Sequence, residues 1–438
     1  MIKMSNIEKE LTGKKLLILG GTSASLDLVK LAQSMGAYVI VTDEADTEQR
    51  VSKQIADEVA MVSTNDIEGL AKLVKEKNID GAFCGPSEFN LKNVIDLCSK
   101  MNLPCYATPE QWEMCSNKEV FKRFCRENNV PTAPEYEIDE FLEEGKDEKV
   151  EYPVIVKPVD GCSSKGISIC RNREEVQKAY EFALSFSKSK NVVIEQYIDN
   201  GGVIFSFRYI LKDGNYYPYL AFDTYIADPI NKKCLISAFT YYPSNYINTF
   251  FAEINDNVKT MFKNMGLKNG VAFIQAIPYK GKIYCHEMGF RLSGGMIYKI
   301  TEPLMDINDM KMMLRFALGG EIATEEELSR INLQNQNIAI AQLMIPLECG
   351  TIDSVQGLDE ILMMPNVIDF LQYYNEGDTI TPEVYGTLGQ HFGRFTLKAK
   401  KKEEMIKIIN KIQELLKIKN SEGDEMYKMK FNFLRINK

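Results

Sequence analysis

The first 112 residues alternate short apolar runs with helical segments, and this alternation restricts the fold more than any other feature. The apolar runs lie at 15–19, 38–43, 60–62 and 81–84, and helical spacing is found at 25–36 and 67–77. Continuous apolar runs are typical of strands buried on both faces, and strands that alternate with helices form parallel sheets. The sequence therefore predicts an α/β domain with a doubly wound parallel sheet.

From residue 116 onwards the pattern changes to longer strands separated by single helices. Strands are predicted at 154–158, 192–195, 203–211, 216–225, 234–242, 271–278 and 282–288, and helices at 174–187, 254–265 and 402–418. Because 271–278 and 282–288 flank Lys280-Gly281, we expect them to pair as a hairpin. The fold class is therefore α/β in the first part and α+β in the rest.

The composition disfavours several classes of function. The 438 residues carry a formal net charge of −9, whereas a general nucleic-acid-binding surface is basic. The N-terminus is too polar for a signal peptide and no apolar run is long enough to cross a bilayer, so we expect a cytoplasmic protein. The ten cysteines include no CxxC pair, and the two histidines are too few for a His-rich metal site.

A glycine turn, Gly20-Gly21, joins the first predicted strand to the first predicted helix. Such a turn can hold a phosphate at a helix N-terminus, and Asp43, at the end of the second strand, is placed to bind a ribose. The spacing GxGxxG is not met, however, and a tight structural turn is the alternative interpretation. The missing fingerprint also argues against a dehydrogenase built on this domain.

A lysine and a glycine-containing turn lie at the end of the strand 154–158. Lys157 is a point charge that can neutralise a phosphate. The turn Ser163-Ser164-Lys165-Gly166 is small and rich in hydroxyl groups, and its amides can surround phosphate oxygens. On their own, these residues are equally consistent with a lysine beside a surface hairpin.

The strand at 192–195 ends in polar residues, Glu195-Gln196-Tyr197-Ile198. Such a strand end can offer main-chain groups to the edge of a purine. On its own, an ordinary strand terminus explains it as well.

The hairpin and the residues after it contain the most specific set of side chains. If its strands are adjacent, Gln275 and Glu287 face the same side, and an amide oxygen with a carboxylate suits Mg²⁺. Arg291 can hold a phosphoryl group or an anionic intermediate. Gly294 and Gly295 leave backbone amides free to approach a carboxylate. A solvated glutamate and a surface arginine are the alternative interpretation.

Two further groups of residues remain open. His286 precedes Glu287 but does not complete an HExxH motif, so we expect it on the opposite strand face as a core or edge histidine. Arg208, Asp223 and Tyr225 are candidates for lining a substrate pocket, although core and surface packing explain them equally well.

Taken in order, these segments resemble the ATP-grasp superfamily, and in particular carboxylate–amine ligases similar to L-amino-acid ligases and biotin-carboxylase-like enzymes. The resemblance implies a Rossmann-like pre-ATP-grasp domain at 1–115 and an ATP-grasp domain at 116–320. Within the second domain, about 131–190 would form a mobile lid. The C-terminal part, 321–438, would complete the ATP-grasp and substrate region.

The resemblance also implies a role for each matching residue. Lys118 and Lys157 match the two nucleotide-binding lysines, and Ser163 to Gly166 match the loop over the phosphates. Glu195, Gln196 and Ile198 match the hinge that reads adenine, partly through main-chain atoms. Gln275 and Glu287 match the metal ligands, Arg291 the arginine near the reacting phosphate, and Gly294 and Gly295 the substrate contacts.

Two positions depart from the pattern of many relatives. Gly289 stands where many have an asparagine ligand, which leaves open whether one or two metal ions bind. The ribose-binding glutamate expected soon after the hinge is also missing, with Asp199 as a substitute.

The resemblance implies an ADP-forming ligase that uses ATP with Mg²⁺ or Mn²⁺, small carboxylate and amine substrates, and a homodimer as a common assembly. A bicarbonate-activating carboxylase or a carbamoyl-phosphate-synthase-like enzyme is one alternative. A protein that binds ATP without turning it over is another.

Overall fold

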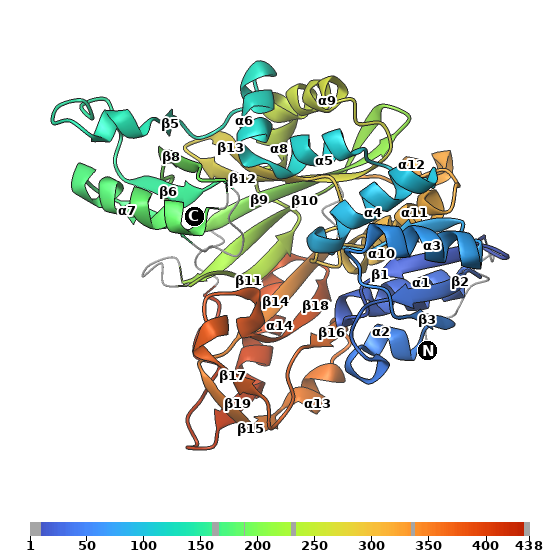
Figure 1. Cartoon of the computed structure of the whole chain (residues 1–438). Coiled ribbons are helices and arrows are strands. Elements are labelled where there is room, and N and C mark those ends of the chain that lie inside the picture. Colours follow the sequence, from blue (N-terminus) through green and yellow to red (C-terminus); the bar gives the residue numbers. More distant parts are fainter. Residues whose placement is uncertain (1–9, 160–165, 188, 229–233, 334–337, 433–438) are drawn as a thin grey trace.

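The computed structural model describes residues 10–159, 166–187, 189–228, 234–333 and 338–432 (Figure 1). In Figure 1 a large sheet lies between the N-terminal part, at the right, and a smaller sheet with one helix, at the left. Over the described ranges, none of the helices has the length and apolar character needed to span a bilayer.

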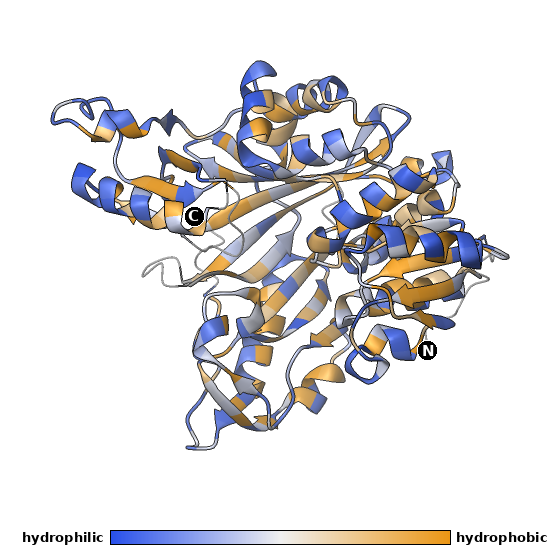
Figure 2. Cartoon of the chain, in the orientation of Figure 1, coloured by the Kyte–Doolittle hydropathy of each residue, from blue (hydrophilic) through white to orange (hydrophobic). Residues whose placement is uncertain are grey.

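The N-terminal part is a parallel sheet with the strand order β3-β2-β1-β4. Its strands are β1 (Lys15–Leu19), β2 (Tyr38–Thr42), β3 (Glu58–Ala60) and β4 (Gly81–Phe83). Its helices are α1 (Leu26–Ser34), α2 (Val51–Gln54), α3 (Ile67–Lys77) and α4 (Glu88–Met101). Figure 2 shows apolar strands with the polar sides of helices outermost, as expected for strands buried on both faces.

Two short helices lead into a second, small sheet. They are α5 (Pro109–Ser116) and α6 (Lys118–Glu127). The small sheet has the order β5-β8-β6-β7 and is antiparallel, with α7 (Arg173–Phe186) packed on it. Its strands are β5 (Glu135–Tyr136), β6 (Val154–Pro158), β7 (Ser168–Cys170) and β8 (Val192–Gln196). Strands β5, β6 and β7 of this sheet fall within the segment expected to form the lid, and β8 follows directly after it.

The large sheet has the order β13-β12-β9-β10-β11-β14-β18-β16, and its pairings are antiparallel. Its central strands are β9 (Val203–Lys212), β10 (Asn215–Asp228), β11 (Cys234–Tyr242), β12 (Gly270–Tyr279) and β13 (Lys282–Gly289). C-terminal residues extend it through β14 (Ala339–Pro346), β16 (Val367–Gln372) and β18 (His391–Ala399). One sheet therefore joins the central and C-terminal parts of the chain.

Seven further α-helices and a fourth sheet, of three strands, complete the described part of the structure. The helices are α8 (Ile247–Thr249), α9 (Asn255–Asn264), α10 (Tyr298–Met305), α11 (Asp309–Ala317), α12 (Glu325–Ser329), α13 (Leu358–Leu362) and α14 (Lys402–Leu415). The sheet has the order β17-β15-β19, from β15 (Gly350–Gln356), β17 (Thr379–Ile380) and β19 (Lys417–Asn420). The predicted helix 402–418 is too long, because residues from Lys417 onwards pair with β15.

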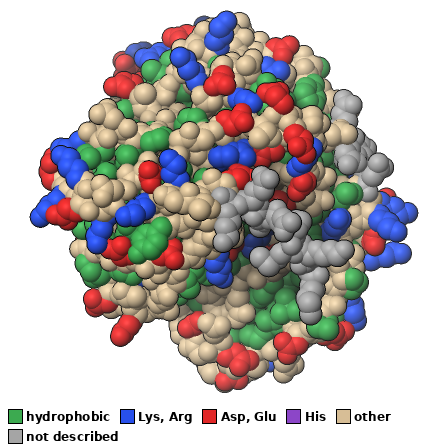
Figure 3. Space-filling model, turned by 90° about the vertical axis from the view of Figure 1, so that its right-hand side faces the viewer, with side chains coloured by type: hydrophobic (Ala, Val, Ile, Leu, Met, Phe, Trp, Pro, Cys, Tyr) green, Lys and Arg blue, Asp and Glu red, His purple; other side chains and the backbone are tan. Residues whose placement is uncertain are grey.

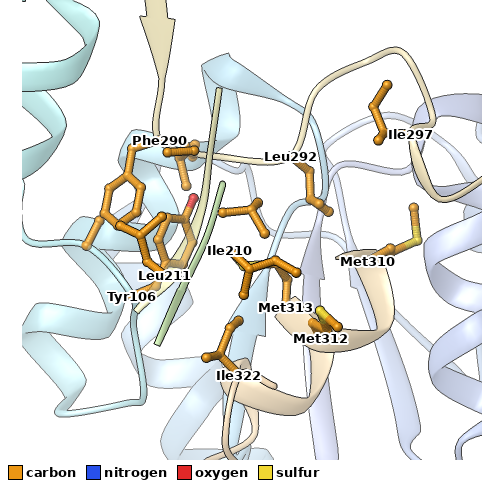
Figure 4. Packing of buried hydrophobic residues seen from close by; sticks show 14 of the residues in the cluster. Tyr106, Ile210, Leu211, Phe290, Leu292, Ile297, Met310, Met312, Met313 and Ile322 are labelled. Carbon is orange, nitrogen blue, oxygen red and sulfur yellow. The ribbon is translucent and has the colours of Figure 1, made fainter. Parts of the chain in front are cut away.

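The N-terminal part and the large sheet share one hydrophobic core. Figure 4 shows Ile210 of β9 close to Met312 and Met313 of α11, with Leu211 beside Tyr106 and Phe290. On the surface in Figure 3, acidic and basic side chains are interspersed. The parallel N-terminal sheet and the antiparallel sheets that follow it confirm the predicted fold class. The predicted domain boundaries fall at the end of α5 and soon after α11 and stay a prediction.

Candidate active site

A buried cluster of lysines and glutamates connects α6 to the small sheet. Glu195 of β8 accepts hydrogen bonds from Lys157 of β6 and from Lys122 of α6. Lys122 also pairs with Glu135 at 2.6 Å. Lys118 lies one helical turn before Lys122, at the start of α6, where Asn117 accepts hydrogen bonds from the first amides of the helix. The predicted residues Lys118, Lys157 and Glu195 are therefore brought together.

The charges in this cluster shift the pKa values of its members. Burial lowers the pKa of Lys157, and the neighbouring Lys122 and Lys118 lower it further, whereas Glu195 opposes them. Burial works to raise the pKa of Glu195, but Lys157 and Lys122 outweigh it and hold that pKa at about 2. Glu195 is thus ionised at neutral pH, and its charge is used to hold two lysines.

Lys122 and Glu135 are not among the residues predicted from the sequence to form the site. The signal for Lys122 was present, because residues four apart on a helix lie on the same face, and Lys122 follows Lys118 at that spacing. Glu135 carried no such signal, because it reaches Lys122 only after β5 pairs with β8.

The structure describes part of the predicted hinge and loop. The amide of Gln196 donates to the carbonyl oxygen of Pro134, and the amide of Tyr197 to that of Pro153, both at 2.9 Å. These two amides therefore stabilise the fold. The side chain of Gln196 donates to Glu151 at 2.7 Å, and Ile198 is buried. Gly166 has a φ of +75°, and a Cβ there would meet Phe186 at 2.9 Å. Ser163, Ser164 and Lys165 lie outside the described residues.

Gln275 and Glu287 are opposite each other on β12 and β13, as the sequence predicted. Both are half-buried, and within the described part of the chain neither side chain has a hydrogen bond or ion pair. Two oxygen-bearing side chains on one face suit Mg²⁺ that takes its other ligands from phosphates and water. Among the same residues no cluster of three or more His, Cys, Asp or Glu could hold a metal ion. The pair therefore fits a metal bound together with a polyphosphate, and does not fit an all-protein metal site.

His286 lies close enough to the lysine cluster for the charges of the cluster to act on it, and a β-bulge interrupts the alternation from which its place on the opposite face was predicted. The register of β12 and β13 shifts between Gln275 and Ala276, which leaves His286 as an extra residue in a β-bulge. Burial lowers the pKa of His286 to about 3, and the charge of Lys157 contributes. Its Nδ1 is buried and has no hydrogen-bond partner among the described residues. Of two consecutive residues of β13, His286 is thus near the lysine cluster and Glu287 belongs to the predicted metal pair.

Arg291 is held at the border between the large sheet and the N-terminal part. The residues on either side of it, Phe290 and Leu292, are buried in the shared core, and the Phe290 ring packs edge-to-face on Tyr106 at 5.1 Å (Figure 4). The guanidinium of Arg291 pairs with Glu88, in the first turn of α4, at 2.9 Å. A carboxylate is therefore already bound where the sequence predicted an anion.

The carbonyl groups of Gly294 and Gly295 are held by two side chains of the large sheet. Gln342 of β14 donates to the oxygen of Gly295 at 2.9 Å, and Arg394 of β18 donates to that of Gly294 at 3.4 Å. These contacts orient the glycine segment relative to the sheet. Gln342 and Arg394 come from the C-terminal part and could not be linked to this segment from the sequence.

An aromatic ring leaves no room for a side chain at Gly289. A Cβ at Gly289 would lie 2.4 Å from the ring of Phe273, its partner on β12. The ring therefore occupies the space that an asparagine would need. It also packs against two guanidinium groups, those of Arg208 at 5.0 Å and Arg291 at 5.2 Å from its centre.

Gly289→Ala should therefore destabilise the protein by about 1–3 kcal/mol, because the buried Phe273 ring has to move. Urea unfolding would measure this. Gly294→Ala is the matched control, because a Cβ there meets nothing within 4 Å, and we expect a change below about 0.5 kcal/mol. Equal stabilities of the two variants would contradict the role given to the ring.

Three other candidates, Asp43, Asp223 and Tyr225, have partners within the fold. Asp43 accepts hydrogen bonds from the amides of Gly21 and Ala45 and pairs with Arg50 at 3.2 Å, which favours the tight turn over a ribose site. Asp223 is buried and accepts hydrogen bonds from Ser244 and Asn245. Tyr225 packs on Phe239 and Phe431.

Comparison with known proteins finds a matching family model and several related enzymes. Residues 129–214 match the family model described as the D-ala D-ala ligase C-terminus. A formate-dependent phosphoribosylglycinamide formyltransferase of Sulfurisphaera tokodaii is 24% identical over 70% of this chain and 76% of its own length. The enzyme of the same name from Methanocaldococcus jannaschii is 26% identical over 42% of this chain, and the match spans 48%, about half, of that protein.

Two solved structures share the fold over nearly the whole chain. The L-amino acid ligase from Bacillus licheniformis has a TM-score of 0.75 at 21% identity, covering 94% of this chain and 99% of that one. The phosphoribosylglycinamide synthetase from Anaerococcus prevotii has a TM-score of 0.72 at 19% identity, covering 93% and 100%. These similarities show that the chain shares the fold of these two enzymes, and that residues 129–214 are similar to the C-terminal part of D-ala D-ala ligases.

Proposed function

We propose that this protein is an ATP-dependent ligase that joins a small carboxylate to an amine through an acyl phosphate. The proposal rests on one observation, which is that three sets of side chains come together on β13 and just after it. His286 lies by the lysine cluster, Glu287 pairs with Gln275, and Arg291 follows within one short loop. Such a set can neutralise a triphosphate, hold its metal and bind an anion next to it.

The reaction has two steps. A carboxylate oxygen of the substrate attacks the γ-phosphorus of ATP, the bond to the bridging oxygen breaks, and ADP leaves with the electron pair. The amine nitrogen then attacks the acyl carbon, the carbon–oxygen bond to phosphate breaks, and phosphate leaves while the amine loses a proton to water. No covalent enzyme intermediate is needed, because positioning and charge neutralisation supply the catalysis.

Each set of residues has a role in these steps. Lys157 and Lys118 would neutralise the phosphates as negative charge moves onto ADP. Gln275 and Glu287 would hold Mg²⁺, which supplies positive charge to the phosphate oxygens. Arg291 would bind the substrate carboxylate and the anionic adduct, and Glu88 would have to release it first.

A product assay tests the proposal. The protein would be incubated with ATP, Mg²⁺ and pooled carboxylates and amines, and the nucleotide product identified. We expect ADP and phosphate in equal amounts, formed only when a carboxylate is present, and hydroxylamine in place of the amine should trap the acyl group as a hydroxamate. AMP with pyrophosphate would contradict the proposal, and so would ATP binding without turnover. ADP formation that depends on bicarbonate alone would favour a carboxylase instead.

A further inference from the structure

Arg208 is a buried cation that lacks a partner. Its side chain comes from the middle of β9 and is 6% exposed. Over the described residues its guanidinium makes no ion pair or hydrogen bond, and its Nε is fully buried without a partner. An arginine is rarely left in this state, because burying an unpaired charge is costly.

The strand register places Arg208 on the same face as the predicted metal pair. Arg208 is opposite Phe273 on β12, and two residues earlier Ser206 is opposite Gln275, which in turn is opposite Glu287 on β13. Residues opposite each other, and residues two apart on one strand, share a face of the sheet. Arg208 is therefore part of the face on which the reaction is proposed to occur.

Its neighbours give the positive charge of Arg208 no direct ion pair among the described residues. The guanidinium lies between the rings of Phe222 and Phe273, at 5.2 and 5.0 Å from their centres, and Arg291 lies over the same Phe273 ring. Asp309 is near enough for its charge to act on Arg208 but is beyond ion-pair distance. One oxygen of Asp309 accepts a hydrogen bond from Tyr219 at 2.8 Å, and the other has no partner in the described part.

We propose that Arg208 binds a second anionic group of the substrate, a carboxylate or a phosphate, beside the carboxylate held at Arg291. The preferred substrate is then a small molecule with two anionic groups. An arginine can bind either group through two parallel hydrogen bonds, and the flanking rings fix the plane of the guanidinium. This inference rests on the proposed ligase activity and names the substrate class of that same site.

The first test compares matched pairs of acids in the hydroxamate assay. The pairs are acetate with malonate and L-serine with O-phospho-L-serine, so that a second carboxylate and a phosphate are tested separately. We expect kcat/KM to favour the dianionic member of at least one pair by about 10- to 100-fold. Arg208→Met should remove this preference, and Arg208→Lys should restore only part of it, because an ammonium group does not form the paired hydrogen bonds. An equal preference in the Arg208→Met variant and the wild type would overturn the inference.

The second test does not depend on turnover. Malonate and inorganic phosphate would be titrated into the wild type and the variants by calorimetry, after thermal melts have shown that each is folded. Arg208→Met should weaken binding of at least one anion about 10- to 100-fold, while Arg123→Gln, which removes an exposed arginine of α6, should bind like the wild type. The inference would be overturned if neither anion binds to the wild type, or if Arg208→Met binds both anions as tightly as the wild type does. If no acid is turned over but this binding pattern is found, the ligase proposal fails and the anion site stands.

Discussion

Glu287→Ala should reduce metal-dependent ADP formation by about 100- to 1,000-fold, because the carboxylate is one of two side chains placed to hold the metal at the phosphates. The variant should keep its fold, since no described residue pairs with the Glu287 side chain. The measurement is the rate of ADP formation over a range of Mg²⁺ concentrations, with the unfolding temperature of each variant as a check. The concentration for half-maximal rate should rise, and Gln275→Ala should show a smaller effect, because an amide oxygen carries no full charge.

Glu360→Ala, on the surface helix α13, is the matched control and should have the wild-type rate and metal dependence. An unchanged rate for Glu287→Ala at limiting Mg²⁺ would show that the metal is held elsewhere. A fall in the rate with a large loss of stability would assign Glu287 to the fold instead.

Much of the fold could be predicted from the sequence, because the spacing of apolar residues is clear where the helices and strands are regular. Helix α3 has the predicted bounds, and β12 and β13 pair around Lys280-Gly281 as expected. The turn alone would place Gln275 opposite His286, and the β-bulge shifts the register so that Glu287 is opposite Gln275. The C-terminal strands of the large sheet were harder to predict, because they pair with strands distant in the sequence.

The site was predictable where a motif lies on one element and not where elements meet. The place of His286 was predicted from strict alternation, which the β-bulge interrupts. The partners of Arg291 and Glu195, namely Glu88 and Lys122, come from other elements and are defined only after packing. Likewise Gly289 was noted as a departure from related sequences, but the ring of Phe273 that explains it is visible only in three dimensions.

Glu195→Gln should lower the free energy of unfolding by about 3–5 kcal/mol, because it removes the negative charge that holds two buried lysines. Glutamine keeps the shape of the side chain, so the effect reports the charge. Lys122 would keep Glu135, but Lys157 would have no carboxylate partner among the described residues. Urea unfolding measures the change. The control is Glu68→Gln, which removes one partner of an exposed pair with Lys100 and should change stability by less than about 1 kcal/mol.

The wild type and Glu195→Gln also allow the pH dependence of the free energy of unfolding to be tested. Burial works to raise the pKa of Glu195, but Lys157 and Lys122 lower it to about 2, below the value of 4.5 for an unperturbed glutamate. The unfolded chain therefore takes up the proton first as the pH falls. The stabilisation from the ionised carboxylate, about 3 kcal/mol, is fully present above pH 4.5 and is lost as the pH falls towards 2.

The difference in unfolding free energy between the wild type and Glu195→Gln should therefore shrink by about 2 kcal/mol between pH 6 and pH 3, because glutamine does not titrate. Urea unfolding of both proteins at each pH gives this difference directly, and other titrating groups cancel when they are unaffected by the substitution. A difference that stays constant over this range would mean that Glu195 is not the ionised partner of the two lysines. The charge balance proposed for the nucleotide-binding side of the site would then be wrong.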